Sequence, residues 1–309
     1  MGGQRCGLLL AIALCAAGVG AAPTAPVRVS FDSLARDPAG RPVRLTALLY
    51  APEPSGAPRP AVIALHGCGG LYVDTPAGAD ALTARHRAMA EMLVGEGYAV
   101  LLPDSFGPRG RREQCALPAR DQRITPAVRR LDVLGALAWL RGRADVAGDR
   151  IALVGWSHGG STTLAAMNAQ DRVVAAFRDA REGAYFATAI AFYPGCSVYA
   201  RARQTYTPAA PLAIMIGASD NWTPPAPCAV FAEAMVERGL PVSLRIYEGA
   251  VHGFDAPGAR VVVRRDVTTG VYPGLGVSIG GNPAARADAY ARLKAILRER
   301  IGGADRDPR

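Results

Sequence analysis

A serine between two glycines is the clearest sign of chemistry in this chain. Residues 155–159 read Gly-Trp-Ser-His-Gly, after the apolar run Ile151–Val154 and before a helical stretch from Ser161. A serine on a sharp strand-to-helix turn exposes its hydroxyl above a sheet, and flanking glycines avoid clashes there. Ser157 is therefore predicted to be a nucleophile, with a plain glycine turn as the alternative.

A nucleophilic serine needs a base. The chain has four histidines. His66 and His158 lie inside glycine motifs and His86 lies in a predicted helix, whereas His252 follows the last predicted strand. That place fits the chain order Ser, Asp, His. His252 is the predicted general base, with an ordinary surface histidine as the alternative.

The base in turn needs a carboxylate that orients it. Asp220 lies just beyond the apolar run 211–216, where the loop after an earlier strand should hold this acid. Asp255 is close to His252 in sequence and could not easily reach behind its ring. Asp104 follows another strand and would serve only in a variant arrangement. Asp220 is favoured.

Two backbone N–H groups should form an oxyanion hole beside the serine. One is expected from His158, at the start of a helix whose dipole favours an anion. The other is expected from Cys68, in the run His66-Gly-Cys-Gly-Gly70, which is similar to the glycine loops of esterases. Such a donor contributes about 3 kcal/mol to a transition state. Again, plain glycine turns are the alternative.

Alternating strand and helix patterns must position these groups. Apolar runs predict strands buried on both faces, as in a parallel sheet. Two earlier runs flank the turn 37–40 and predict an antiparallel hairpin. The predicted strands begin near residues 27, 43, 61, 98, 151, 186, 211 and 242. The pattern predicts an α/β fold: a mostly parallel central sheet with helices on both faces and an N-terminal antiparallel hairpin.

Helix signals separate most of these strands. Residues 80–96 are rich in helix formers, Thr125-Pro126 and Asn282-Pro283 are typical helix starts, and an apolar stripe follows each start. The Gly-rich segment 268–281 is too long for a simple turn and could form a flap near the active-site mouth. No linker divides the chain, so residues 22–309 are predicted to form one domain.

The first residues are typical of an export signal. Arg5 precedes the apolar run 7–17, and Val19-Gly-Ala21 fits a small-x-small cleavage site. Residues 1–21 are predicted to be a signal peptide, and the mature protein periplasmic or secreted, without stable membrane insertion. The alternative is an uncleaved membrane anchor. A lipid-anchored Cys15 is disfavoured because the preceding leucine is bulky.

Cleavage would leave an even number of cysteines: Cys68, Cys115, Cys196 and Cys228. An oxidising compartment favours disulfides. Four cysteines allow three pairings, between which sequence alone does not choose. We favour Cys68–Cys115 and Cys196–Cys228, because each pair follows strands expected to be neighbours. The alternative is buried free thiols.

The formal net charge of +9 is carried almost wholly by arginine, since Lys294 is the only lysine. The arginines are scattered, and no nucleic-acid-binding motif accompanies them. We therefore expect no nucleic-acid partner. A weak attraction for anionic substrates or anionic lipid surfaces is consistent with this charge.

Taken together, the motifs resemble the dienelactone hydrolase family of α/β-hydrolases over residues 43–300. The likeness rests on the 66–70 glycine run, the serine motif, Asp104-Ser-Phe-Gly-Pro-Arg-Gly, Phe192-Tyr-Pro-Gly-Cys, Gly217-Ala-Ser-Asp and His252-Gly-Phe-Asp. It implies a single-domain hydrolase with a Ser/Cys–Asp–His triad and neither cofactor nor metal. Dienelactone hydrolases proper have a cysteine nucleophile and an arginine soon after the histidine. This chain has Ser157 and lacks that arginine, so dienelactone itself is a doubtful substrate.

The leading hypothesis is hydrolysis of a small-molecule carboxylic ester or lactone through an acyl-enzyme. A peptidase or amidase of the prolyl-oligopeptidase type and a non-catalytic binding protein are the alternatives. Three residues are candidates for substrate contact. Arg109 could bind an anion, its alternatives being a salt bridge to Asp104 or a solvated arginine. Trp156 and Trp222 could shape a pocket, their alternative being core packing.

Overall fold

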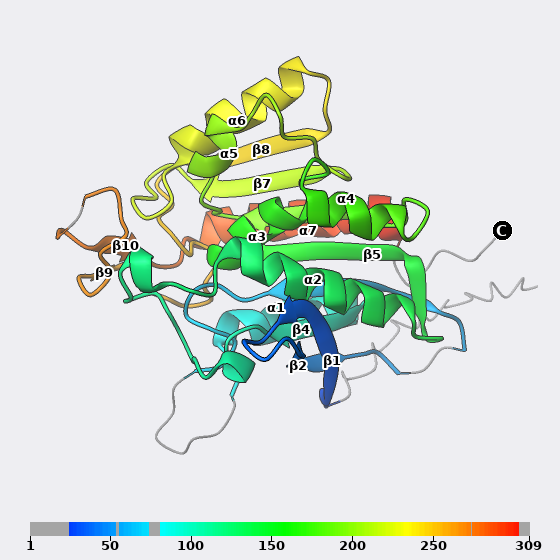
Figure 1. Ribbon diagram of the computed structural model, residues 1–309. Coiled ribbons are helices and arrows are strands. Elements are labelled where there is room, and N and C mark those ends of the chain that lie inside the picture. The colour runs from blue at the N-terminus through cyan, green and yellow to red at the C-terminus, as the bar shows by residue number, and fades with distance from the viewer. Residues whose placement is uncertain (1–24, 54–55, 74–80, 273, 303–309) are drawn as a thin grey trace, which may run out of the picture.

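The apolar runs form the strands of one large sheet in the computed structural model, which describes residues 25–53, 56–73, 81–272 and 274–302 (Figure 1). The predicted signal peptide, residues 1–21, lies outside the described residues. The strands follow the spatial order β1-β2-β4-β3-β5-β6-β7-β8. Their bounds are β1 Val27–Arg36, β2 Pro42–Tyr50, β3 Arg59–Leu65, β4 Ala99–Asp104, β5 Val146–Trp156, β6 Thr188–Phe192, β7 Leu212–Gly217 and β8 Val242–Tyr247.

The direction of the strands agrees with the prediction. β1 and β2 form the expected antiparallel hairpin, and β2 also pairs antiparallel with β4. All other neighbours in this sheet are parallel. The carboxyl ends of the parallel strands therefore meet at one edge, where loops from different parts of the chain can converge.

Helices cover both faces of the sheet. α2 and α3 lie on one face, and α1 and α7 lie on the other (Figure 1). The predicted starts at Thr125 and Asn282 are confirmed as N-caps, since each side chain accepts a backbone N–H of the first turn. The helices are α1 Ala84–Gly95, η1 Gly107–Arg109, η2 Ala119–Asp121, α2 Pro126–Arg141, α3 His158–Ala166, α4 Arg172–Asp179, α5 Ser197–Arg201, α6 Pro225–Glu237 and α7 Pro283–Ile301.

The core lies between these layers. Every residue of β4, β6 and β7 is buried, as expected for strands covered on both sides. The edge strand β1 instead alternates, with Phe31, Ser33 and Ala35 buried and their neighbours mostly exposed. Burial of a large aliphatic side chain stabilises a fold by about 1.5–3 kcal/mol, so this core fixes the edge at which the loops converge.

Helices α4, α5 and α6 and the strand β9 were not predicted from the sequence. α6 begins with two prolines within three residues and carries apolar residues on its exposed face, at Val230 and Val236, as well as on its buried face, which hid it in the sequence. The Gly-rich segment contributes a strand to a separate two-stranded sheet, β9 Val262–Arg264 with β10 Val277–Ile279. Among the helices that the structure describes, none has the length and apolar character needed to span a membrane.

Candidate active site

Ser157 sits at a sharp turn between β5 and α3. Its backbone has φ 53° and ψ −115°, a conformation that side-chain-bearing residues rarely adopt and that often marks a functional site. Its N–H donates to Phe192 O at 2.9 Å, which ties the turn to the neighbouring strand β6. Its hydroxyl does not cap the new helix, although serine is a favoured N-cap residue. The hydroxyl is therefore available to another partner.

The glycines around this serine are required by close backbone contacts. A Cβ on Gly155 would lie 2.2 Å from Gly159 O, and a Cβ on Gly159 would lie 2.3 Å from Leu65 O. Real Cβ atoms do not approach oxygen so closely. The Gly-x-Ser-x-Gly pattern thus reflects helix α3 packing directly on the ends of β3 and β5.

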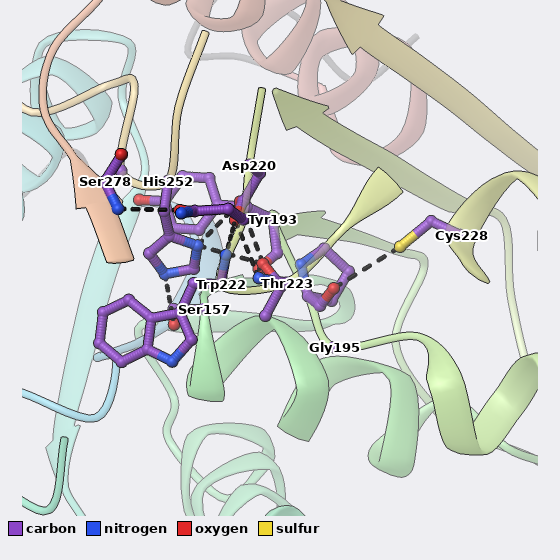
Figure 2. Close-up of polar contacts among 12 residues, drawn as sticks. Ser157, Tyr193, Gly195, Asp220, Trp222, Thr223, Cys228, His252 and Ser278 are labelled. Atoms are coloured by element: carbon purple, nitrogen blue, oxygen red, sulfur yellow. Dashed lines mark hydrogen bonds and ion pairs between the residues drawn. The ribbon is translucent and has the colours of Figure 1, made fainter. Parts of the chain in front are cut away.

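Three residues from far-apart loops are joined by hydrogen bonds at this edge (Figure 2). His252 Nε2 lies 2.8 Å from Ser157 Oγ, and His252 Nδ1 lies 2.8 Å from Asp220 Oδ2. A carboxylate can only accept, so Nδ1 carries the proton and Nε2 faces the serine hydroxyl as an acceptor. This arrangement can remove the hydroxyl proton as the oxygen attacks an electrophile.

Asp220 and His252, the predicted acid and base, are both buried, at 3% and 4% exposure. Asp220 Oδ1 accepts the backbone N–H groups of Trp222 and Thr223 at 2.9 and 2.8 Å. The Thr223 hydroxyl lies 3.0 Å from Asp220 Oδ2 and 3.1 Å from His252 Nδ1. The carboxylate is thus held in one orientation by hydrogen bonds. Nothing in the sequence singled out Thr223, apart from its place three residues after the acid.

Two aromatic rings enclose the histidine. Tyr193 and Trp222 each have their ring centre 4.7 Å from that of His252. The Trp222 indole N–H donates to Thr269 Oγ1 at 3.0 Å, so the tryptophan joins the histidine to the Gly-rich segment. Of the predicted substrate contacts, Trp222 is the one that lies at the triad, and it is only partly buried.

The loop after β3 lies against the serine. A Cβ on Gly67 would be 3.5 Å from Ser157 Cβ, so the residue that precedes Cys68 lies against the predicted nucleophile. Among the described residues, no acceptor receives the Cys68 N–H. The His158 N–H lies in the first turn of α3, where helical N–H groups lack intrahelical partners. Both expected oxyanion-hole donors are therefore uncommitted.

A disulfide holds this loop in place. Cys68 is bonded to Cys115, and Cys68 O accepts the N–H of Gln114 at 2.9 Å. The Gln114 side chain also contacts the His158 ring: Gln114 Nε2 lies 3.0 Å from His158 Nε2. The other predicted disulfide, Cys196–Cys228, is also formed and lies beside Pro194. Both favoured pairings are confirmed.

The histidines around the oxyanion donors are neutral. Burial, together with the nearby charge of Arg129, lowers the pKa of His158 to about 3 and that of His66 well below its usual value. A neutral His66 can donate from Nδ1 to Gly67 O at 2.7 Å and accept the Ser105 N–H at Nε2. The ring thereby anchors the glycine loop, a role that the sequence motif did not reveal.

The model of the dienelactone hydrolase family matches residues 45–301. This chain belongs to that family. It is therefore a dienelactone hydrolase-family hydrolase, as the resemblance of its motifs indicated. No curated protein matches the chain closely enough to be called a relative.

Solved structures of low sequence identity share the fold of this family member. A dienelactone hydrolase-like promiscuous phosphotriesterase from metagenomic libraries is 19% identical, with a TM-score of 0.62, covering 90% of this chain and 100% of its own. Thermogutta terrifontis esterase 2, phosphorylated by paraoxon, is 20% identical, with a TM-score of 0.60. The match covers 89% of this chain and 95% of the esterase chain.

The competing acid Asp255 has a different place in this family member. Its fully buried carboxylate accepts Tyr193 OH at 2.6 Å and Trp156 Nε1 at 2.8 Å, and it pairs with Arg85 Nε at 3.0 Å. These contacts link the loop of the base to the residue before the nucleophile. Trp156 is fully buried in this network, so core packing describes it better than pocket lining.

Arg109 lies on Asp132 and not on Asp104. Its guanidinium forms two hydrogen bonds with the Asp132 carboxylate, at 2.8 and 2.9 Å, and one with Ser105 O. Asp104 instead accepts the backbone N–H groups of Phe106 and Gly107. The expected Asp104 pair is thus replaced, and both terminal nitrogens of Arg109 already donate to protein atoms. Within the described part of the chain, no three His, Cys, Asp or Glu side chains gather closely enough to bind a metal.

Proposed function

We propose that residues 22–309 form an exported serine hydrolase that cleaves a carboxylic ester or lactone. The observation that carries the proposal is the hydrogen-bonded chain from Ser157 through His252 to Asp220, at 2.8 Å for each link. Export is supported by the leader-like residues 1–21 and by two disulfides, which are typical of oxidising compartments.

In the proposed mechanism, Ser157 Oγ attacks the substrate carbonyl while His252 Nε2 takes its proton. Asp220 keeps the ring oriented and stabilises the imidazolium that forms. The N–H groups of Cys68 and His158 bind the oxyanion, each worth about 3–4 kcal/mol in comparable enzymes. The histidine then protonates the leaving alcohol. Water, deprotonated by the same histidine, hydrolyses the acyl-enzyme and regenerates the serine.

Turnover of p-nitrophenyl esters by Ser157→Ala tests the proposal. We expect a loss of kcat of about 10⁴-fold or more, because removal of such a nucleophile disables the whole triad. The matched control is Ser278→Ala, since Ser278 lies near the triad but contributes only its backbone N–H, to Asn221. Wild-type activity that survives in Ser157→Ala would refute the proposal.

Covalent labelling gives a second, independent test. Esterase 2 was solved with a phosphoryl group from paraoxon, so an organophosphate is a suitable probe for a nucleophilic serine on this fold. Mass spectrometry should find the label on Ser157 in the wild type and find it strongly reduced in His252→Gln. A panel of peptides and amides beside the esters separates an esterase from a peptidase.

A further inference from the structure

Exposed apolar side chains concentrate in one small hairpin at the active-site edge. We name residues 260–272 and 274–280 the mouth hairpin; it contains β9 and β10. Large apolar side chains that are at least 40% exposed there are Val261, Val262, Val263, Val271, Tyr272 and Leu275, with Leu275 at 68%. This is more than half of all such residues in the described chain. A cluster of this kind is typical of an interaction surface.

The mouth hairpin has no apolar layer of its own to bury these residues. Strand neighbours point to opposite faces, yet Val262 and Val263 are both about half exposed. β9 pairs only with β10 among the described strands. The inward side is filled by Val267 and Val277, which pack with Trp222 and the Cys68–Cys115 disulfide. The remaining valines and Tyr272 therefore face outward.

The mouth hairpin is fastened to both loops of the triad. Gly280 N–H donates to His252 O at 3.0 Å, and Val271 N–H donates to Asn221 O at 2.9 Å, next to Asp220. Figure 2 shows Ser278 beside His252. The Ser278 N–H donates to Asn221 Oδ1 at 2.8 Å. Anything bound to the outward side therefore lies next to the loops that carry Asp220 and His252.

The positive charge of the mouth hairpin and of the neighbouring loop favours an anionic partner. Residues 105–124 and 256–281, which meet where Cys115 packs on Val267 and Val277, hold eight arginines against three acidic residues. One of these arginines, Arg109, is paired with Asp132, which lies outside both ranges, so the excess is four positive charges. Arg260 and Arg265 are exposed and flank the valines. Exposed apolar side chains flanked by cations are typical of a surface that binds anionic lipid.

The same charges disfavour a second copy of this chain. If two β9 strands paired antiparallel across their open edges, centred on Val262, Arg260 of each would oppose Arg264 of the other. Like charges directly opposite each other destabilise a strand pair. A lipid surface has no such conflict, since its headgroups carry the opposite sign.

We propose that the mouth hairpin docks this protein onto an anionic lipid surface and so presents Ser157 to amphiphilic esters held there. The docking itself does not depend on catalysis. Its use in ester hydrolysis rests on the proposed function.

Vesicle co-sedimentation with the Ser157→Ala form of residues 22–309, which lacks the apolar predicted signal peptide, tests docking without turnover. We expect binding to phosphatidylcholine vesicles that contain phosphatidylglycerol, at least tenfold weaker binding to phosphatidylcholine alone, and weakening with added salt. Adding Val262→Ser and Val263→Ser should reduce binding at least tenfold, as should Arg260→Gln with Arg265→Gln. The matched control is Val198→Ser with Val236→Ser, which replaces two valines 61% and 62% exposed on α5 and α6.

Each result decides the proposal. Equal binding by the hairpin and control variants, equal binding to both vesicle types, or no binding would overturn it, provided that thermal unfolding midpoints are unchanged. A dimer in light scattering that Val262→Ser with Val263→Ser dissociates would identify a second copy as the occupant instead. Vesicle binding by a wild type that hydrolyses no ester would refute the proposed function and leave docking intact.

Discussion

Removal of the Cys68–Cys115 disulfide should damage catalysis far more than removal of Cys196–Cys228, although both should cost similar stability. The bridged residues are 47 and 32 positions apart. Loop-closure entropy then gives about 4 kcal/mol of stabilisation for each disulfide, with a difference of about 0.3 kcal/mol. Paired alanine substitutions at either disulfide are therefore matched in their expected effect on the free energy of unfolding.

The two pairs differ in what they hold. Cys68 carries one proposed oxyanion donor, and its partner belongs to the segment that places Gln114 against His158. Loss of a donor costs about 10²–10³-fold in kcat, and misplacement by about 1 Å can cost about 10²-fold. We expect kcat to fall at least about tenfold for Cys68→Ala with Cys115→Ala. For Cys196→Ala with Cys228→Ala we expect a change within about threefold.

The assay is p-nitrophenyl ester turnover at a temperature where circular dichroism finds both variants folded. Urea unfolding checks that their stability losses match. Equal losses of kcat in the two variants would contradict the reasoning, because a general loosening would then explain both. An unchanged kcat without Cys68–Cys115 would show that the glycine loop holds its N–H groups unaided.

Three further predictions concern buried groups. Asp255→Asn should lower the free energy of unfolding by about 3–5 kcal/mol, because it leaves the Arg85 charge without its ion-pair partner. Adding Arg85→Met to this variant should restore part of the lost free energy, as measured by urea unfolding. Burial lowers the pKa of His86 to about 3, while its unfolded value stays near 6.5. Between these two pKa values the unfolded chain binds more protons than the folded protein. The free energy of unfolding therefore falls, as the pH is lowered, by about 1.4 kcal/mol per pH unit for each buried neutral histidine. His86→Gln should reduce this slope by about 1.4 kcal/mol per pH unit between pH 6.5 and 4.5, while His66 and His158 still contribute, and an unchanged slope would refute the assignment. Gly159→Ala should abolish ester turnover or soluble expression, since its Cβ would lie 2.3 Å from Leu65 O.

The order and type of the elements were predictable because most strands of the sheet are continuous apolar runs in the sequence. Strands buried on both faces, such as β4 and β7, need no polar alternation and stand out in the sequence. Chain order then located Asp220 and His252, because the carboxyl ends of parallel strands share one edge. Local spacing sufficed for these inferences.

Partnerships between distant residues were not predictable in the same way. Arg109 meets Asp132 across 23 positions because helix α2 brings the carboxylate under the loop, which no local pattern records. Asp255 reaches Trp156 across 99 positions, and from sequence it could be weighed only as a rival acid. Of the mouth hairpin, only the Gly-rich segment 268–281 was expected, as a flap, and β9 was not predicted because its valines follow no strand alternation.

Helix α3 has no side-chain cap, so backbone N–H groups of its first turn lack a hydrogen-bond partner when no substrate is bound. Serine at such a position ordinarily secures the first turn, worth about 1 kcal/mol. Here the Ser157 hydroxyl bonds to His252, and the backbone N–H of His158, the first residue of α3, receives no side-chain cap. An oxyanion formed on Ser157 would complete the helix end. The turn is therefore expected to be at its most ordered only while a substrate is reacting, and to tighten measurably when a phosphoryl group from paraoxon mimics that state.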